Sequence, residues 1–478
     1  MAKYDLLLKG GTVLDPVNGL EGINDVAITA GAIERVEPEL DPFDADDLID
    51  LSGKWVMPGQ IDTHAHVAGI SEAWDPALGY AMLARAGTTT LLDLAGTGPT
   101  LIDGMQRRGA GLNVAGLHVM APGSTIDDGE PSPSSLSNIV TDAIRQGCIG
   151  VKMIGGYQPF TPEATANVIR ACNDQLAYVA FHVGTTESGS HLGGLREIPE
   201  LVGDGRLHVA HVNSYCRGVI EESHAECDEA LSILESMRGQ LTSEAYHAVP
   251  NGTNCKCDQA GNVLANVPQN CLRARGYPTT REGVSQAILD GYGSVVAPRG
   301  GQVQYIKGRE ALEIFDQAGT DVPMSFPVNL PDSAFRLTTA KNDSGEFIVD
   351  AVSTDGGCHP RNIAIESTMA LVQFGALTPL EMATKLSWTP ARMLGLLNKG
   401  HFSLGADADV TVLDPSVNRP AMSLVAGKLI MLEGRSIGSG GTLLVTSEGE
   451  KTAKDSGLPY QVLDLSQSKL YEEYRTAR

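Results

Sequence analysis

The chain has 478 residues, of which 42% are hydrophobic, 54 are glycine and 25 are proline. This composition is typical of a loop-rich globular enzyme and excludes a disordered or fibrous chain, and the length predicts one large domain with a smaller one. A formal net charge of −23 argues against nucleic acid and anionic membranes as partners.

The first residues, MAKYDLLLKGGTVLD, lack the long apolar segment of a signal peptide, and the chain has no apolar run as long as a membrane span. Eight cysteines in a chain of this length fit reduced thiols better than a disulfide framework. We therefore expect a cytoplasmic protein.

Both ends of the chain predict β structure. Residues 1–55 contain short apolar segments separated by turns, one of them at Gly10-Gly11. After residue 390 similar segments return, at 408–414, 423–425, 428–431 and 443–445. We expect residues 1–55 and 391–478 to form one discontinuous β-sandwich domain, with a terminal helix in the polar tail 466–478.

Between about 56 and 390, short apolar strands alternate with helical segments, which is the pattern of repeated βα units. The expected strands are 60–66, 88–94, 113–120, 149–154, 177–183, 206–212, 241–248 and 350–355. Eight such units predict an α/β fold with a (β/α)8 TIM barrel, whose active site gathers at the carboxyl ends of the strands. Residues 249–350 are too many for an ordinary connection and predict an insert over the barrel mouth.

The first barrel strand ends in His64-Ala65-His66. Residues i and i+2 of a strand project the same way, so the two imidazoles lie side by side, as two ligands of one metal ion require. A single HxH often arises by chance on a solvated strand end. Its interpretation therefore depends on what ends the later strands.

Lys152 interrupts the apolar strand 150–154. Burying a charged amine without a partner is costly, so it is either a snorkelling or ion-paired lysine, or a deprotonated amine that takes up CO2 as a carbamate and bridges two metal ions. His182 ends the fifth strand, and the sixth carries His208 and His211. These two lie three apart and face opposite sides of a strand; we expect His211, nearer the strand end, to enter the mouth and His208 to pack.

Asp355 leaves the eighth strand before Gly356-Gly357 and, taken alone, is an ordinary turn residue. In strand order, however, the polar residues form a set that suits two divalent metal ions, most simply Zn2+. The set is His64, His66, Lys152, His182, His211 and Asp355. Two close metal ions lower the pKa of a shared water and present hydroxide. Asp355 would bind one metal ion, take the proton of the attacking hydroxide as general base, and then pass that proton to the leaving nitrogen.

With these residues the chain resembles the amidohydrolase superfamily over nearly its whole length. PGQIDTHAHV is similar to its strand-one motif, GVKMIGG to the carboxylated-lysine strand of hydantoinases and dihydropyrimidinases, and VSTDGG to its strand-eight aspartate motif. Residues 405–414 with 425–428 resemble the β-sandwich of its cyclic-amidase and deacylase branches. The resemblance implies a binuclear hydrolase of a small cyclic amide or imide, such as a hydantoin-like ring, with a carbamate on Lys152. Relatives are commonly dimers or tetramers, which implies a homo-oligomer.

Other branches remain open. The insert and the length resemble N-acyl-D-amino-acid deacylases, but these usually lack the lysine and use a cysteine from strand two, where this chain has 93–95, Asp-Leu-Ala. Dihydroorotases carry an arginine where this chain has Ala68. Heterocycle deaminases generally use one metal ion and no strand-four lysine, and non-enzymatic scaffold relatives lose the metal ligands.

The loops after the ligand-bearing strands predict the contacts to a small-molecule substrate. We expect these contacts from Tyr157, Tyr215, Arg217 and His359. Arg217 would hold a substrate carboxylate through its bidentate fork, or else pair at the surface with residues 221–222. His247, near the end of strand seven, either binds substrate or is a hydrogen-bonded structural histidine.

Overall fold

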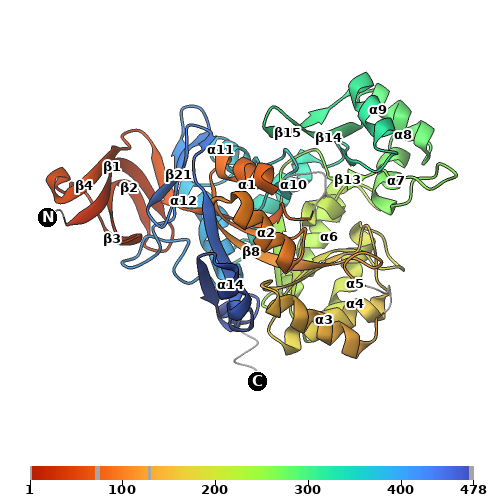
Figure 1. Ribbon diagram of the computed structural model, residues 1–478, viewed down its shortest axis with the longest axis horizontal. Helices are drawn as coiled ribbons and strands as arrows, with labels where there is room; N and C mark the ends of the chain where they lie inside the picture. Colours follow the sequence, from red (N-terminus) through yellow and green to blue (C-terminus); the bar gives the residue numbers. More distant parts are fainter. Residues whose placement is uncertain (1–2, 70–75, 127–130, 473–478) are drawn as a thin grey trace.

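The computed structural model describes residues 3–69, 76–126 and 131–472. Its centre is a parallel sheet whose strands follow one another around a ring, β17-β12-β11-β10-β9-β8-β7-β6-β18 (Figure 1). The strands are β6 (Gln60–His66), β7 (Thr88–Asp93), β8 (Ala110–Met120), β9 (Gly150–Ile154), β10 (Tyr178–His182), β11 (Leu207–Val209), β12 (Leu241–Ala245), β17 (Ala351–Val352) and β18 (Gly356–Gly357). β17 pairs with β12 and β18 with β6, so the segment 351–357 closes the sheet into a barrel. The predicted α/β barrel is confirmed.

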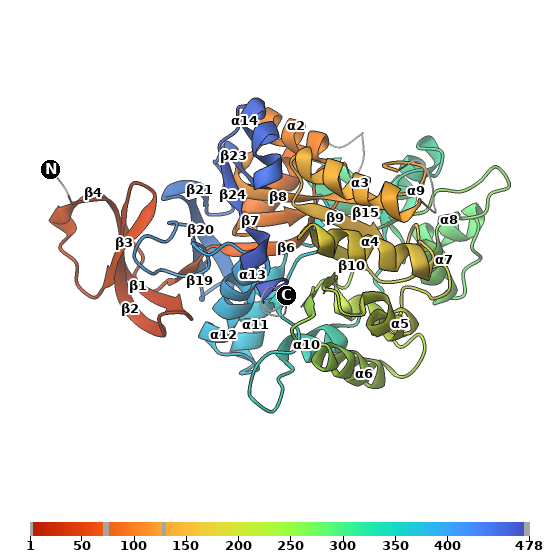
Figure 2. The ribbon, with the colours of Figure 1, turned by 90° about the horizontal axis from the view of Figure 1, so that it is seen from below.

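Helices follow the strands and cover the outside of the barrel (Figures 1 and 2). They are α1 (Pro76–Arg85), α2 (Gly98–Arg108), α3 (Pro133–Arg145), α4 (Pro162–Asp174), α5 (Leu192–Val202), α6 (Ser223–Ser236), α10 (Pro331–Thr339) and α11 (Ala364–Gln373). Serine or threonine caps begin α2, α3 and α4: Thr97, Ser132 and Thr161 each accept a backbone N–H, and each helix has a proline in its first turn. Local sequence thus sets where these helices start.

The insert between β12 and α10 has its own sheet and core. Its antiparallel strands are β13 (Thr253–Asn254), β14 (Ser294–Arg299), β15 (Gln302–Ile306) and β16 (Pro323–Ser325). Its helices are α7 (Asn266–Arg273), α8 (Arg281–Leu289) and α9 (Gly308–Gln317). A separate apolar cluster that includes Phe315 and Phe326 fills the insert. It forms the lobe at the upper right of Figure 1.

The two ends of the chain share one nine-stranded sheet. Its strands are β1 (Tyr4–Asp15), β2 (Leu20–Thr29), β3 (Ala32–Glu37), β4 (Ala45–Asp50), β5 (Trp55–Pro58), β19 (Val410–Asp414), β20 (Arg419–Val425), β21 (Lys428–Leu432) and β22 (Arg435–Ser436). Antiparallel pairing of β19 with β5 joins the ends, as Val412 lies opposite Val56. The predicted turn at Gly10-Gly11 is wrong: β1 runs through it, and Gly10, at φ +73°, absorbs a bulge opposite β2.

The segment 443–445, which we expected in the small β domain, lies instead in β23 (Gly440–Thr446), beside β8 of the barrel. The reason is that β9 pairs with β8 only from Leu117 onward, which leaves the first half of β8 as an open edge. β23 covers that edge and pairs in turn with β24 (Tyr460–Leu463), next to α14 (Glu450–Ser456).

The remaining helical segments lie after α11. α12 (Pro379–Ala383), a π-helical turn at 384–388 and α13 (Thr389–Met393) form one run. Of the predicted tail helix, 465–467 is a 3-10 turn, and residues 473–478 lie outside the described part. None of the helices in the described ranges has the length and apolar run of a membrane span.

Candidate metal centre

Three predicted ligands meet where β6 and the eighth strand end. His64 Nε2 lies 3.2 Å from His66 Nε2, and the Asp355 Oδ1 atom lies 2.9 Å from His66 Nε2 and 3.4 Å from His64 Nε2. Within the described residues, only these three offer metal-type donor atoms that all lie within 4.8 Å of one another. Two imidazole nitrogens and a carboxylate oxygen are donors that Zn2+ accepts.

The protonation of His64 favours this role. Its Nδ1 lies 2.7 Å from Oε1 of the fully buried Glu244. A carboxylate only accepts, so Nδ1 carries the proton and Nε2 presents a lone pair toward His66 and Asp355. Such a carboxylate–histidine pair behind a ligand fixes its tautomer and ring orientation.

The other predicted ligands surround this trio. The ring centroid of His211 lies 5.0 Å from that of His64 and 4.5 Å from that of His182. Lys152 is buried on β9, and neither its Nζ nor Nδ1 of His211 has a hydrogen-bond partner in the described structure. Two orphaned buried polar atoms beside this trio fit a site that a metal ion or a modification of the lysine would complete.

Burial keeps the imidazoles of His64, His182 and His211 neutral. It lowers the pKa of His64 to about 4, with a further contribution from the nearby Lys152, and it holds the pKa values of His182 and His211 well below the usual range. Burial also lowers the pKa of Lys152 to about 8. Neutral imidazoles and a readily deprotonated amine are the forms that bind metal or CO2.

Asp355 is held in its ionised form and in an uncommon backbone conformation. Burial opposes ionisation, but the Arg361 guanidinium, 2.9 Å from Oδ2, and the neighbouring histidines hold the pKa of Asp355 well below its usual value. Its φ is +47°, and the preceding Thr354 is fixed by its backbone and hydroxyl donating to Asp62. This strain at a ligand position is maintained by the surrounding buried hydrogen bonds.

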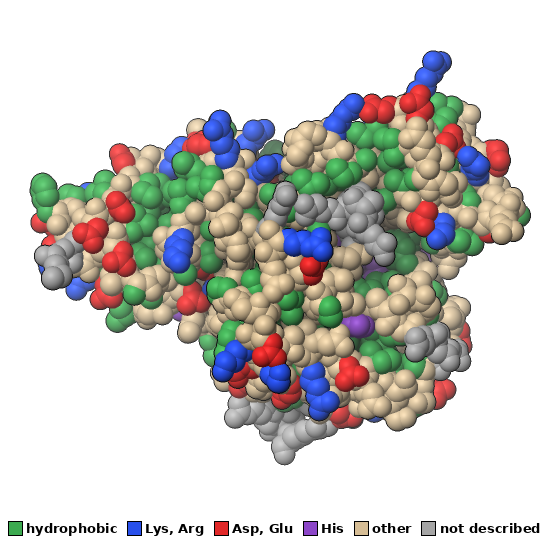
Figure 3. Space-filling view, viewed as in Figure 1, with side chains coloured by type: hydrophobic (Ala, Val, Ile, Leu, Met, Phe, Trp, Pro, Cys, Tyr) green, Lys and Arg blue, Asp and Glu red, His purple; other side chains and the backbone are tan. Residues whose placement is uncertain are grey.

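All six predicted ligands line one cavity of about 590 Å³ between the barrel mouth and the insert. Figure 3 shows histidine atoms in the hollow between the insert lobe and the barrel. Three predicted substrate contacts, Tyr157, Arg217 and His359, line the same cavity. The Tyr157 hydroxyl donates to the Gly252 carbonyl at 2.5 Å, which fixes the insert over the mouth.

Two other predicted contacts lie elsewhere. The Tyr215 hydroxyl accepts from the Val183 N–H at 2.8 Å, and its ring packs behind His182 and His211 without lining the cavity. His247 also lies outside the lining. Its ring nitrogens meet the hydroxyls of Ser367 and Thr338 at 2.7 and 2.8 Å, as expected for a structural histidine.

Arg217 does not form the surface ion pair with residues 221–222 that was the alternative to substrate binding. Its guanidinium donates twice to Asn329 Oδ1, at 2.9 and 2.6 Å, whereas Glu221 pairs with Arg196. The positive charge of Arg217 therefore faces the cavity beside a neutral partner.

We expected His208 and His211 to face opposite sides of the sixth strand, and this is wrong, because both side chains lie inside the barrel. His211 is at the mouth, and His208 is packed, as expected. β11 ends at Val209, and His211 adopts φ +37° beyond it, which turns its side chain back toward the mouth. His208 packs below, with Nδ1 2.7 Å from the Tyr178 hydroxyl and Nε2 3.5 Å from Glu244.

Sequence reasoning missed Glu244 and Arg361. Glu244 is an acidic residue in the apolar strand β12, and such a residue needs buried donors; that signal was available. It accepts from the His211 N–H at 2.8 Å and from the Ser353 hydroxyl, besides His64. Arg361 follows the eighth strand in a loop with no periodic pattern, and only the fold brings it to Asp355.

A parallel barrel with a histidine, lysine and aspartate cluster at the carboxyl ends of its strands is an arrangement suited to metal-dependent hydrolysis. Residues 55–225 match the amidohydrolase family, and the chain contains a domain of that family. The chain is 26% identical over 444 residues to a dihydroorotase of Pelotomaculum thermopropionicum, covering 87% of this chain and 90% of that protein.

It is 25% identical over 471 residues to an N-acyl-D-glutamate deacylase of Alcaligenes xylosoxydans xylosoxydans, covering 86% and 88%. The fold is similar to the crystal structure of an N-acyl-D-glutamate deacylase from Bordetella bronchiseptica, complexed with zinc and a phosphonate inhibitor. That match has a TM-score of 0.66 and 17% identity, and it covers 92% of this chain and 99% of that one.

Proposed function

We propose that this hydrolase of carbon–nitrogen bonds other than peptide bonds opens a small cyclic amide or imide, such as a hydantoin-like ring, at a site for two divalent metal ions. The observation that carries the proposal is the Lys152 amine. It is buried, has no hydrogen-bond partner in the described structure, and lines the cavity with the histidine cluster. A carbamate on this amine would supply the oxygen ligands that a two-metal site needs.

His64, His66 and Asp355 would hold one ion, and His182 and His211 would serve the other, with Lys152 between them. When bound, metal ions of this kind activate a water molecule and polarise the amide carbonyl. The chain's own contribution centres on Asp355, whose carboxylate can take the proton from the attacking water and pass it to the leaving nitrogen. Arg361 orients that carboxylate through its contact at 2.9 Å.

Metal analysis of the purified protein, paired with ring opening of a hydantoin, tests the proposal. We expect about two zinc-type ions per chain, ring-opening activity that disappears after chelation, and recovery when Zn2+ is restored. A protein that contains one ion per chain, or none, and opens the hydantoin ring equally well before and after chelation would contradict the two-metal hypothesis.

The second candidate is deacylation of an N-acyl amino acid. It is favoured by the insert, whose residues 251–254 form a wall of the cavity, and by the similarity of the chain to an N-acyl-D-glutamate deacylase. The same preparation assayed on an N-acetyl amino acid separates the two: release of acetate without ring opening would move the assignment to the deacylase.

A further inference from the structure

A second cavity of about 640 Å³ adjoins the candidate active site. It is bounded by α7 of the insert and by the loop that follows His211. Ser190, Arg217 and Val267 line both cavities, so the two share a wall.

The second cavity is basic. Arg217, Arg273 and Arg275 line it, with His191, and its lining contains neither aspartate nor glutamate, although the chain as a whole has a net charge of −23. Arginines on so acidic a protein usually find carboxylates, as Arg281 of the same insert finds Asp316 at 2.7 Å.

The partners of these three arginines are neutral. Arg217 donates to Asn329, and Arg273 donates to Gln269 Oε1 at 2.7 Å. The Arg275 guanidinium lies 5.6 Å from the ring centroid of Tyr292. In the described ranges of the chain, none of the three has a carboxylate within ion-pairing distance, so their charges add to a positive potential in the cavity.

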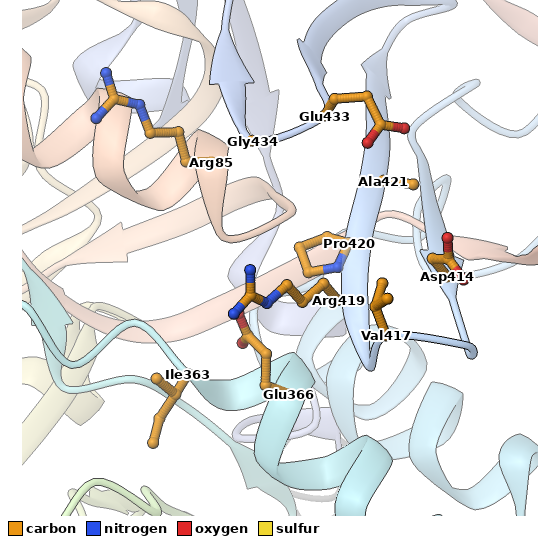
Figure 4. A pocket seen from close by; sticks show the side chains of 10 residues that line it. All are labelled: Arg85, Ile363, Glu366, Asp414, Val417, Arg419, Pro420, Ala421, Glu433 and Gly434. Carbon is orange, nitrogen blue, oxygen red and sulfur yellow. The ribbon is translucent and has the colours of Figure 1, made fainter.

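Another cavity shows the contrast. It holds about 600 Å³ between α1, α11 and the strands β19 and β20, away from the histidine cluster (Figure 4). Its lining carries both signs of charge, and Figure 4 shows the Arg419 side chain extending toward Glu366. With two arginines against three carboxylates in its lining, this cavity offers no net attraction for an anion.

We propose that the arginine-lined cavity is an anion subsite of the active site, and that the substrate carries a carboxylate or phosphate group remote from the scissile amide. This inference rests on the proposed function, which it deepens by naming a substrate class. Arginine is suited to the task because its planar fork pairs with two oxygens of such a group. Arg217, shared by both cavities, would hold the end of the anion nearest the reaction, and Arg273 and Arg275 the outer end.

Binding tests the subsite without turnover. Isothermal calorimetry at low salt would use glutarate, its neutral diamide, and inorganic phosphate as probes. We expect glutarate or phosphate to bind and the diamide not to bind. The double variant Arg273→Ala/Arg275→Ala should weaken anion binding by about 2- to 10-fold, as expected for exposed charges, and 0.5 M salt should do the same. The matched control Arg281→Ala should bind as the wild type does.

The two anions separate the sources: tighter glutarate binding assigns a carboxylate, and tighter phosphate binding a phosphoryl group. Kinetics then separate this inference from the proposed function. A hydantoin with a carboxyalkyl side chain should have a higher kcat/KM than one with an alkyl chain of equal length, and the double variant should abolish the difference through KM. Equal kcat/KM values and no anion binding would overturn the subsite while leaving amide hydrolysis in place.

Discussion

At the residue scale, Lys152 places an amine in a buried position, where its charged form is unfavourable and its uncharged, reactive form is favoured. Burial lowers its pKa to about 8, so the uncharged fraction of the amine rises as the pH rises through that value. Only the uncharged amine takes up CO2. We expect bicarbonate-dependent metal loading of the chelated protein to increase between pH 7 and pH 9, as measured by metal content after desalting.

The substitution Lys152→Ala should remove most bound metal and reduce activity by at least about a hundredfold, because the ligand between the two ions is lost. Added short carboxylates with bicarbonate should restore part of the activity. Metal analysis and the hydantoin assay check both. A Lys152→Ala protein with two ions and full turnover would contradict the proposed site.

Asp355 gives a second prediction at this scale. Asp355→Asn keeps the side-chain volume but removes the proton acceptor, so we expect kcat to fall by about 10²–10⁴-fold, the range for a general base. Circular dichroism should show an intact fold. Retention of more than a tenth of the activity would assign proton transfer to another group.

That the six predicted ligands would line one cavity could be read from the sequence, because each lies in or near the end of a strand of a repeated βα pattern, and parallel strands bring their carboxyl ends together. Glu244 and Arg361 could not be read in the same way. Glu244 acts through contacts with three other strands, and Arg361 lies in an irregular loop, so their roles exist only once the barrel closes.

At the element scale, β12 ties the site together through Glu244, which bonds to His64 on β6 and to the backbone of His211. Glu244→Gln should lower metal affinity by about 10–100-fold, the cost of losing a partner behind a ligand. Competition with a chromophoric chelator measures this affinity independently of turnover.

The matched control is Asp350→Asn. Asp350 is a buried carboxylate directly before β17, the strand that pairs with β12, and it accepts from the Ser243 N–H and pairs with Lys469. The substitution should lower stability but leave metal affinity unchanged. If both variants lose metal equally, Glu244 contributes only to general stability.

The π-helical turn at 384–388 carries another buried lysine. Lys385 is fully buried, donates to the Val349 carbonyl at 2.6 Å and lies 4.3 Å from the Phe347 ring centroid. Burial lowers its pKa from 10.5 to about 7. Between these values the unfolded chain binds more protons than the folded one, so stability rises with pH over that window. Below it both states are protonated, and this group adds no further pH dependence.

Lys385→Met should therefore remove a part of the pH dependence of the free energy of unfolding. Urea unfolding at pH 7 and pH 9.5 should show that the wild type gains at least about 1 kcal/mol more than the variant over that interval. Lys451→Met, at an exposed position, should leave the gain unchanged. An equal gain in wild type and Lys385→Met would contradict the assignment.

The exact ends of the strands could not be predicted from the sequence. The strand β11 ends two residues before His211, and this early end decides which way the imidazole points. β23 pairs with β8 because β9 starts late, a property of the register that periodicity does not encode. The segments themselves were predictable, since their apolar runs are independent of the partners they find.

At the scale of the whole molecule, barrel, insert and terminal sheet each have an apolar cluster, and the cavity lies where the barrel meets the insert. The barrel supplies the metal-type donors, and the insert supplies the far wall with two of the three cavity arginines. The proposed chemistry and the proposed substrate selection thus lie on different parts of the chain, and for this reason the barrel motifs point to the family but leave the substrate open.

Metal should also stabilise the molecule as a whole. The candidate donor atoms come from four barrel strands (β6, β9, β10 and the end of β11) and from Asp355, so an ion that binds the folded chain and not the unfolded one shifts the equilibrium by mass action. At a free concentration of 100 times Kd, the stabilisation is about 2.7 kcal/mol per ion. We expect chelation to lower the melting temperature by several degrees and Zn2+ to restore it in a concentration-dependent way, as measured by scanning calorimetry. Lys152→Ala should show a smaller shift than the wild type, and an identical melting temperature with and without metal would mean that these residues bind no ion.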